Sequence, residues 1–168
     1  MIFQKLLFSS IILSRVSLFR NIILNFSKKM TQYDKSEANY TEALNIYIEL
    51  MKKESEKFKS ILAQNYGNFS WVELLLNKFV QAETLARKGL ETDTSQTWIN
   101  TNLAHALLFQ GKYDEAKVIY LTLKDQPYPK DTTKKFGEIF LEDLDELEKA
   151  SVTHPDVAKT RKLLNQTK

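Results

Sequence analysis

The sequence predicts an all-α protein built from antiparallel helix pairs. Helix-breaking residues are rare, since the 168 residues include only four glycines and three prolines, so long uninterrupted helices are expected. Apolar residues recur at helical spacing along most of the chain. The stretch 98–123 also repeats 34 residues upstream. In that alignment Asn102-Leu103-Ala104 corresponds to Asn68-Phe69-Ser70, Gly111-Lys112-Tyr113 to Asn77-Lys78-Phe79, and Ala116 to Ala82.

Residues 1–30 form a separate basic and apolar block with five basic residues and no acid. Its longest uncharged run, from Leu6 to Ser14, is well short of the roughly 20 apolar residues that a membrane-spanning helix needs. The composition fits a secretory signal, an organellar transit segment, an interfacial membrane helix, or a dispensable leader before a start at Met30. All four interpretations stay open at this stage. The remaining residues, 31–168, form the predicted helical domain.

The first part of that domain is predicted to be a half repeat at about residues 36–52. Its tyrosines and alanine (Tyr40, Ala43 and Tyr47) match Tyr113, Ala116 and Tyr120. A full repeat at about 55–91 follows the charged run at 52–57, which indicates a solvated turn. Gly67 lies inside its first helix at a cost of about 1 kcal/mol relative to alanine, which indicates a kink or a close approach of another element.

The second full repeat is predicted at about residues 95–124. Gly111 ends its first helix, because glycine takes a positive φ at little cost. Ala104 and Ala116 are small enough to let its two helices approach closely, and Tyr113 and Tyr120 fill the space beside them. Thr94 or Ser95 is the expected N-cap.

The last part of the chain is predicted to be a loop followed by two capping helices at about 134–167. Pro127 and Pro129 prevent helix 113–123 from continuing, so residues 124–133 should form the loop. An amphipathic stripe then runs from Phe136 to Leu147, and Pro155 fits the first position of the last helix. Atypical terminal helices of this kind cover the end of a repeat array.

A 34-residue period with small residues, a turn and a following aromatic at fixed positions resembles the tetratricopeptide repeat (TPR) family, in its bacterial form. The resemblance covers about residues 36–124. The matching positions are the small residues Ser70 and Ala104, the turn residues Asn77 and Gly111, the aromatics Tyr40, Phe79 and Tyr113, and the alanines Ala43, Ala82 and Ala116. It implies a right-handed α-α superhelix, a solenoid of antiparallel helix pairs with C-terminal capping helices.

In such repeats the first helices line a concave groove that binds a segment of another protein. The resemblance implies that Trp71, Trp98 and Phe109 anchor an apolar segment while Asn68 and Asn102 bind its backbone. The family's clamp for a terminal carboxylate would be incomplete, since Gly67 and Thr101 stand at its lysine positions. Alternatively, Trp71 packs between repeats. The candidate groove residues are Asn68, Trp71, Leu75, Trp98, Asn102, His105 and Phe109.

Several kinds of chemistry are not expected. The chain has no cysteine, which excludes disulfides and cysteine-based metal sites. His105 has no carboxylate three or four residues away, and the acids between 138 and 148 fit a solvated helix face. We therefore expect no enzyme activity, cofactor or metal. Residues 31–168 contain 19 basic against 21 acidic residues, so we expect no nucleic-acid partner.

The sequence thus favours a protein–protein interaction scaffold or adaptor whose partner is a protein or peptide, with a cytoplasmic location unless residues 1–30 direct it elsewhere. Two alternatives are a regulatory module of a catalytic partner, such as a caspase-like protease, and a membrane-surface adaptor held by residues 1–30. The first alternative rests on analogy with similar bacterial repeats.

Overall fold

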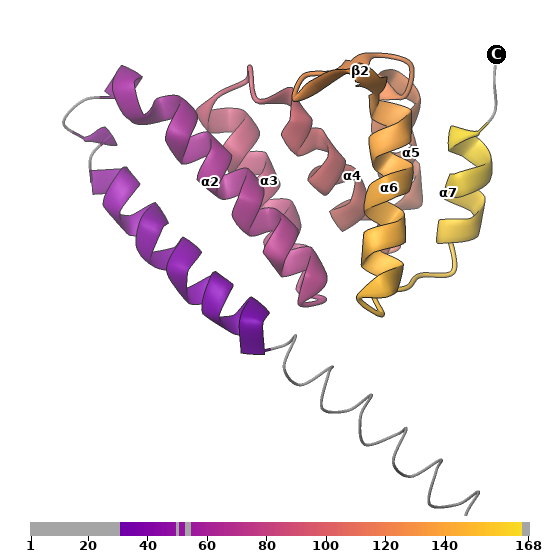
Figure 1. The fold of residues 1–168 in the computed structure, drawn as a ribbon, viewed down its shortest axis with the longest axis horizontal. Helices are drawn as coiled ribbons and strands as arrows, with labels where there is room; N and C mark the ends of the chain where they lie inside the picture. The colour runs from indigo at the N-terminus through magenta and orange to yellow at the C-terminus, as the bar shows by residue number, and fades with distance from the viewer. Residues whose placement is uncertain (1–30, 50, 53–54, 166–168) are drawn as a thin grey trace, which may run out of the picture. The chain divides into compact units, whose positions relative to one another are not determined.

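The computed structural model describes residues 31–49, 51–52 and 55–165 and divides the chain into two units, 1–36 and 37–168 (Figure 1). Of the first unit, residues 31–36 are described and are helical. The predictions made for residues 1–30 therefore fall outside the described residues. The rest of this section concerns the second unit.

The described residues are mostly helical, which confirms the all-α prediction. In the second unit, residues 37–49 are helical and come first, as the continuation of the helix that begins at residue 31. The later elements are α2 (Ser55–Leu75), α3 (Phe79–Thr92), a short 3₁₀ helix η1 (Thr97–Ile99), α4 (Asn100–Phe109), α5 (Tyr113–Leu123), β1 (Pro127–Tyr128), β2 (Asp131–Lys135), α6 (Phe136–Lys149) and α7 (Val157–Leu164).

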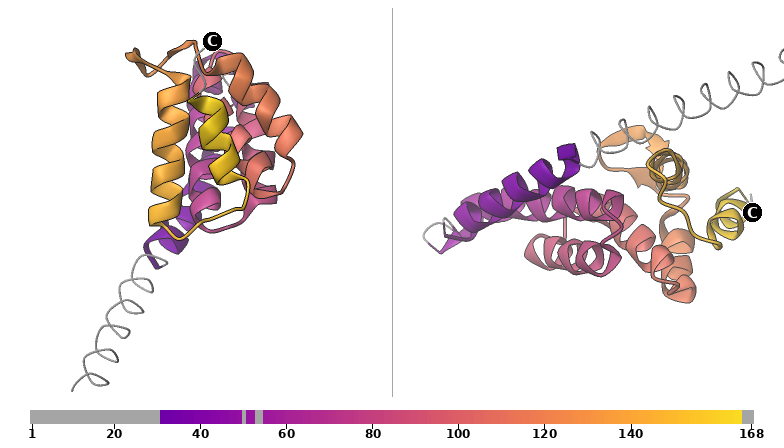
Figure 2. Two further views of the ribbon diagram at one scale, coloured as in Figure 1. Left: turned by 90° about the vertical axis from the view of Figure 1, so that its right-hand side faces the viewer. Right: turned by 90° about the horizontal axis from the view of Figure 1, so that it is seen from below.

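The helices form a row of neighbours. Helix α2 contacts α3 and α4, α4 contacts α5 and α6, and α7 contacts α5 and α6. Seen from below, α2 and α6 lie on one side of this row and α3 and α5 on the other (Figure 2). Helices α2 and α6, which are distant in the sequence, thus share one side of the row.

The same turn ends α2, α4 and α6. Asn77, Gly111 and Ser151 have positive φ angles of 60°, 76° and 65°, so the left-handed turn predicted at Gly111 is present. In each case the next residue donates its N–H to a carbonyl five residues back, over 2.8 Å for Lys78, 3.0 Å for Lys112 and 2.9 Å for Val152. This is the Schellman pattern, which satisfies carbonyls at a helix end.

Small residues lie where the helices approach one another. Ala82, Ala104 and Ala116 are fully buried, whereas Ala43 is half-buried and its neighbour Leu44 occupies the core. A Cβ on Gly67 would lie 2.5 Å from Cη2 of Trp98, so this glycine marks a close approach, one of the two interpretations of its position in the helix.

The segment between α5 and α6 differs in part from the prediction. Helix α5 ends at Leu123, before the prolines, but residues 127–135 form an antiparallel hairpin where we expected an irregular loop. Proline tolerates this position because a two-stranded ribbon has open edges. The Asp131 carboxylate accepts bonds from the N–H and the hydroxyl of Thr133, at 3.1 and 2.6 Å, and so stabilises the start of β2.

Two helix starts were also predicted wrongly. Neither Thr94 nor Ser95 caps the helix that holds Trp98, because Ser95 instead donates its N–H and hydroxyl to the Asp93 carboxylate. The chain then enters α4 through η1. Pro155 precedes α7 by two residues, since the helix begins at Val157 after a turn in which the N–H of Asp156 donates to His154 Nδ1.

Two carboxylates in the row have unusual environments. Glu83 on α3 accepts bonds from Gln110 and Lys112, at 2.8 and 2.7 Å, and from Arg87 at 2.9 Å, so it ties α3 to the α4–α5 turn. Burial alone would raise the pKa of Glu83, but these hydrogen bonds lower it to about 2.

Glu73 near the end of α2 is only 2% exposed, and burial raises the pKa of its carboxyl to about 7. The Lys78 ammonium, 3.9 Å away, opposes this rise, and Glu37 adds to it. The same Lys78 ammonium lies 2.6 Å from the Glu37 carboxylate, so these three groups connect Glu37 to the end of α2.

Candidate functional site

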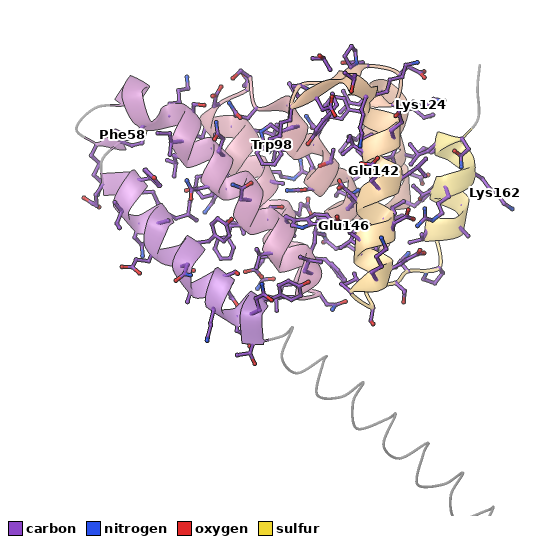
Figure 3. All side chains as sticks on the ribbon, viewed as in Figure 1. Phe58, Trp98, Lys124, Glu142, Glu146 and Lys162 are labelled. Atoms are coloured by element: carbon purple, nitrogen blue, oxygen red, sulfur yellow. The ribbon has the colours of Figure 1, made fainter. Side chains whose placement is uncertain are left out.

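A hollow of about 270 Å³ lies between α2 and α6, and we call it the α2–α6 groove. It receives side chains from the helix at 31–49, α2, η1, α4, the hairpin and α6. The lining residues are Tyr40, Asn68, Trp71, Val72, Trp98, Thr101, Asn102, Tyr128, Lys130, Asp143 and Glu146. Figure 3 shows Trp98 and Glu146 on the side of α6 that faces α2.

Four of the seven predicted groove residues meet in this hollow: Asn68, Trp71, Trp98 and Asn102. They come from α2, η1 and α4, so residues about 30 positions apart in the sequence share this hollow. Asn68 is exposed and Trp71 is half-buried, whereas Trp98 is only 7% exposed. Binding by Asn68, Trp71 and Trp98 stays a prediction.

The other three candidates, Leu75, His105 and Phe109, do not line the groove, and their predicted orientation is wrong. Leu75 is buried, and Phe109 stacks on Phe79 with ring centroids 5.3 Å apart. His105 is completely buried. The reason is that α4 is packed against α2, α3, α5 and α6, so all of its residues from Thr101 to Phe109 are buried and its polar stripe does not face solvent.

Asn102 has a structural partner that the sequence did not reveal. Its Nδ2 donates to the Gly67 carbonyl over 2.7 Å, and its Oδ1 accepts from the Thr101 hydroxyl at 3.3 Å. This side chain ties α4 to α2 and is 3% exposed. We therefore drop the expectation that Asn102 binds a partner's backbone, and Asn68 is the exposed asparagine of the groove.

A cation from the hairpin rests on the indole of Trp98. The Lys130 ammonium lies 3.0 Å from the Trp98 ring centroid, and Trp98 Nε1 donates to Gln96 Oε1 over 3.0 Å. Burial lowers the pKa of Lys130 below its ordinary value of 10.5, and the charge of Asp143 partly offsets this change. Lys130 lies between β1 and β2, so the hairpin brings it to the groove.

The α6 side of the groove carries Asp143 and Glu146. Asp143 Oδ2 lies 3.5 Å from Nε2 of His105, whose Nδ1 lies 3.0 Å from the Tyr120 hydroxyl. Burial, and then the charge of Asp143, raise the pKa of Tyr120 well above 10, so the tyrosine keeps its proton and can donate it to Nδ1. That arrangement places the imidazole proton on Nε2, which lies 3.5 Å from Asp143 Oδ2 and has no hydrogen-bond partner among the described residues.

Sequence reasoning missed Tyr128, Lys130, Asp143 and Glu146 as groove residues. The first two belong to a segment predicted to be a loop, and the two acids to a face predicted to be solvated. Asp143 belongs to α6 and His105 to α4, so their proximity is not visible in the residues one helical turn from His105. The spacing of acids along α6 gave no signal of which ones face α2.

A second hollow, of about 500 Å³, lies between α5 and α7. The Lys159 ammonium lies 3.4 Å from the Tyr113 ring centroid there. The lining residues are Tyr113, Lys117, Pro155, Ala158, Lys159, Lys162 and Leu163. Its lysines are surface residues of α5 and α7.

Within the described ranges, no three histidine, aspartate or glutamate side chains gather as a metal would require. No described helix combines the length and the apolar character needed to cross a membrane. No family model, curated protein or solved structure matches the chain.

Proposed function

We propose that the described part of the second unit is a protein-interaction module of the TPR kind that binds a segment of a partner protein in the α2–α6 groove. One observation carries the proposal. Side chains from three successive first helices, α2, α4 and α6, converge on one hollow that contains both tryptophans of the chain. Large aromatic side chains with a polar edge are the commonest anchors of protein interfaces.

The repeat character of the helix pairs supports the same proposal. The pairs α2–α3 and α4–α5 share a 34-residue sequence period and the same turn geometry. The pair α6–α7 has that turn as well, at Ser151, although its sequence lacks the period. We propose that the three pairs are successive turns of a right-handed α-α superhelix, with α6–α7 as the capping pair.

The size and lining of the groove favour a peptide side chain over a cofactor. A volume of about 270 Å³ is below the roughly 300–1,000 Å³ typical of small-molecule sites. Asn68 at its edge is exposed and carries both a donor and an acceptor, as the backbone of an extended segment requires. The module would therefore bind one or two side chains deeply and the flanking backbone at the rim.

The proposal is tested with a display library of random twelve-residue peptides selected on the purified protein. Each enriched peptide is then measured against wild type, Trp71→Ala and Val80→Ala. Val80 is 63% exposed on α3 and is not among the groove residues, so it controls for a general loss of apolar surface.

We expect the Trp71→Ala variant to bind selected peptides at least tenfold more weakly, and the Val80→Ala variant to bind them like wild type. Circular dichroism and melting curves establish that both variants are folded. Selected peptides that bind wild type and Trp71→Ala equally would show that the groove is not the binding site. An absence of any enriched peptide would also count against the proposal.

A further inference from the structure

We propose that the α2–α6 groove recognises a cationic side chain, a lysine or arginine in a basic segment of the partner, and that Lys130 occupies this subsite in the unbound protein. This inference rests on the proposed function and specifies the chemistry of the ligand. Lys130 is then an internal substitute for the partner's cation.

The position of Lys130 is the first argument. Its ammonium lies 3.0 Å from the centroid of the Trp98 ring, so the groove already holds a cation against an aromatic face. Three further aromatic residues, Tyr40, Trp71 and Tyr128, line the same hollow. Ring faces attract ammonium and guanidinium groups, and the attraction is stronger where water is partly excluded.

The charge of the lining is the second argument. The charged residues of the groove are Lys130, Asp143 and Glu146, so one cation faces two carboxylates. If Lys130 leaves, two negative charges remain in a hollow lined by aromatic rings. A cation from the partner can therefore replace Lys130 and keep the same balance of charge in the groove. An acidic segment would instead be repelled by both carboxylates.

The position of Asp143 is the third argument. The buried His105 ring lies between Asp143 Oδ2, at 3.5 Å from Nε2, and the Tyr120 hydroxyl, at 3.0 Å from Nδ1. Asp143 is therefore a half-buried carboxylate that lies beside this ring and also lines the groove. A half-buried acceptor has fewer side-chain conformations to lose on binding than a fully exposed surface acid.

The exchange needs little movement. Lys130 lies at the turn of a short hairpin, and the residue is exposed although its ammonium contacts the Trp98 ring. Rotation of the Lys130 side chain would uncover the face of the Trp98 ring without moving a helix. Because Lys130 competes with the ligand, the apparent dissociation constant rises in inverse proportion to the fraction of molecules in which the face is vacant.

Two matched pairs of variants test this competition. Lys130→Gln removes the internal cation, and Lys134→Gln removes a lysine of the same hairpin that pairs with Glu142 at 2.7 Å and does not line the groove. Glu146→Gln removes a groove carboxylate, and Glu142→Gln removes a neighbouring one on α6 outside it (Figure 3). Each pair has equal changes in net charge.

The probes are terminally blocked ten-residue peptides that alternate serine with lysine, arginine, norleucine or glutamate. Binding is followed by intrinsic fluorescence, since the two tryptophans of the chain, Trp71 and Trp98, both line the groove. Titrations at about 150 mM salt limit the contribution of distant surface charges.

We expect the lysine and arginine peptides to bind wild type at least tenfold more tightly than the glutamate and norleucine peptides. Lys130→Gln should tighten this binding about three- to tenfold and Glu146→Gln should weaken it at least threefold. Both control variants should stay within twofold of wild type.

Three results would overturn the inference: no preference for basic peptides, weaker binding by Lys130→Gln, or equal effects of Glu146→Gln and Glu142→Gln. The proposed function would survive any of these if library-selected peptides of other composition still depended on Trp71. Loss of that dependence would remove both proposals.

Discussion

Gly67→Ala sets two effects of known size against each other in the middle of α2. Alanine is favoured over glycine in a helix by about 1 kcal/mol, so helix propensity alone predicts a more stable protein. The added methyl group, however, would lie 2.5 Å from Trp98 Cη2 and 2.8 Å from Ile99 Cγ1. Neither contact is possible without a shift of the backbone or of a buried side chain.

The packing cost should exceed the gain in helix propensity. Ile99 is fully buried and Trp98 is 7% exposed, so neither side chain has much free space to move into. Overpacking a rigid core lowers the free energy of unfolding by about 1–3 kcal/mol, and because two contacts are this short we expect the upper end of that range, about 3 kcal/mol. The net effect is a loss of about 2 kcal/mol, or a melting temperature lower by roughly 4–8 °C for a chain of this size.

Urea unfolding followed by circular dichroism measures this loss as a lower midpoint at unchanged slope. Gln64→Ala, one turn earlier on the exposed side of α2, is the control and should change stability by less than about 0.5 kcal/mol. In the Gly67→Ala background, Trp98→Phe should cost less than in wild type, because it removes the ring atoms that the methyl group strikes. A Gly67→Ala variant more stable than wild type would refute the packing argument.

Three further predictions concern buried polar groups. The pKa of Glu83 falls from 4.5 to about 2 on folding, so the ionised carboxylate stabilises the fold fully above pH 4.5, and this stabilisation is lost as the pH falls toward 2. In the Glu83→Gln variant the free energy of unfolding should therefore depend less on pH in this range, by up to about 3 kcal/mol in urea titrations at successive pH values. The pKa of Glu73 instead rises from 4.5 to about 7 on folding, so the protein is most stable below pH 4.5, and its free energy of unfolding falls by up to about 3 kcal/mol by pH 7. In the same titrations the Glu73→Gln variant should be more stable than wild type above pH 7. A lower stability of this variant there would contradict the reasoning. Tyr120→Phe leaves the buried His105 Nδ1 without its partner and should cost about 1–3 kcal/mol in thermal unfolding, whereas Tyr113→Phe, at a half-buried position, is expected to cost under about 0.5 kcal/mol.

The helix pairs could be predicted from the sequence because their signals are local. Gly111 and Asn77 take the left-handed conformation that ends a helix, and they lie 34 residues apart in equivalent turns. Ala82, Ala104 and Ala116 are buried because only small side chains allow the close approach of helix backbones. Each of these preferences depends on the residue itself and on neighbours within one or two turns of helix.

The composition of the groove was decided by tertiary packing. In the sequence, Asn102 is a polar residue on one face of a predicted helix, and nothing near it identifies the Gly67 carbonyl as its hydrogen-bond partner. Lys130 and Asp143 reach the groove only because the hairpin and α6 fold back toward α2 and α4. Periodicity specifies which residues share a helix face, but the partner of that face depends on contacts between distant segments, which a single sequence does not record.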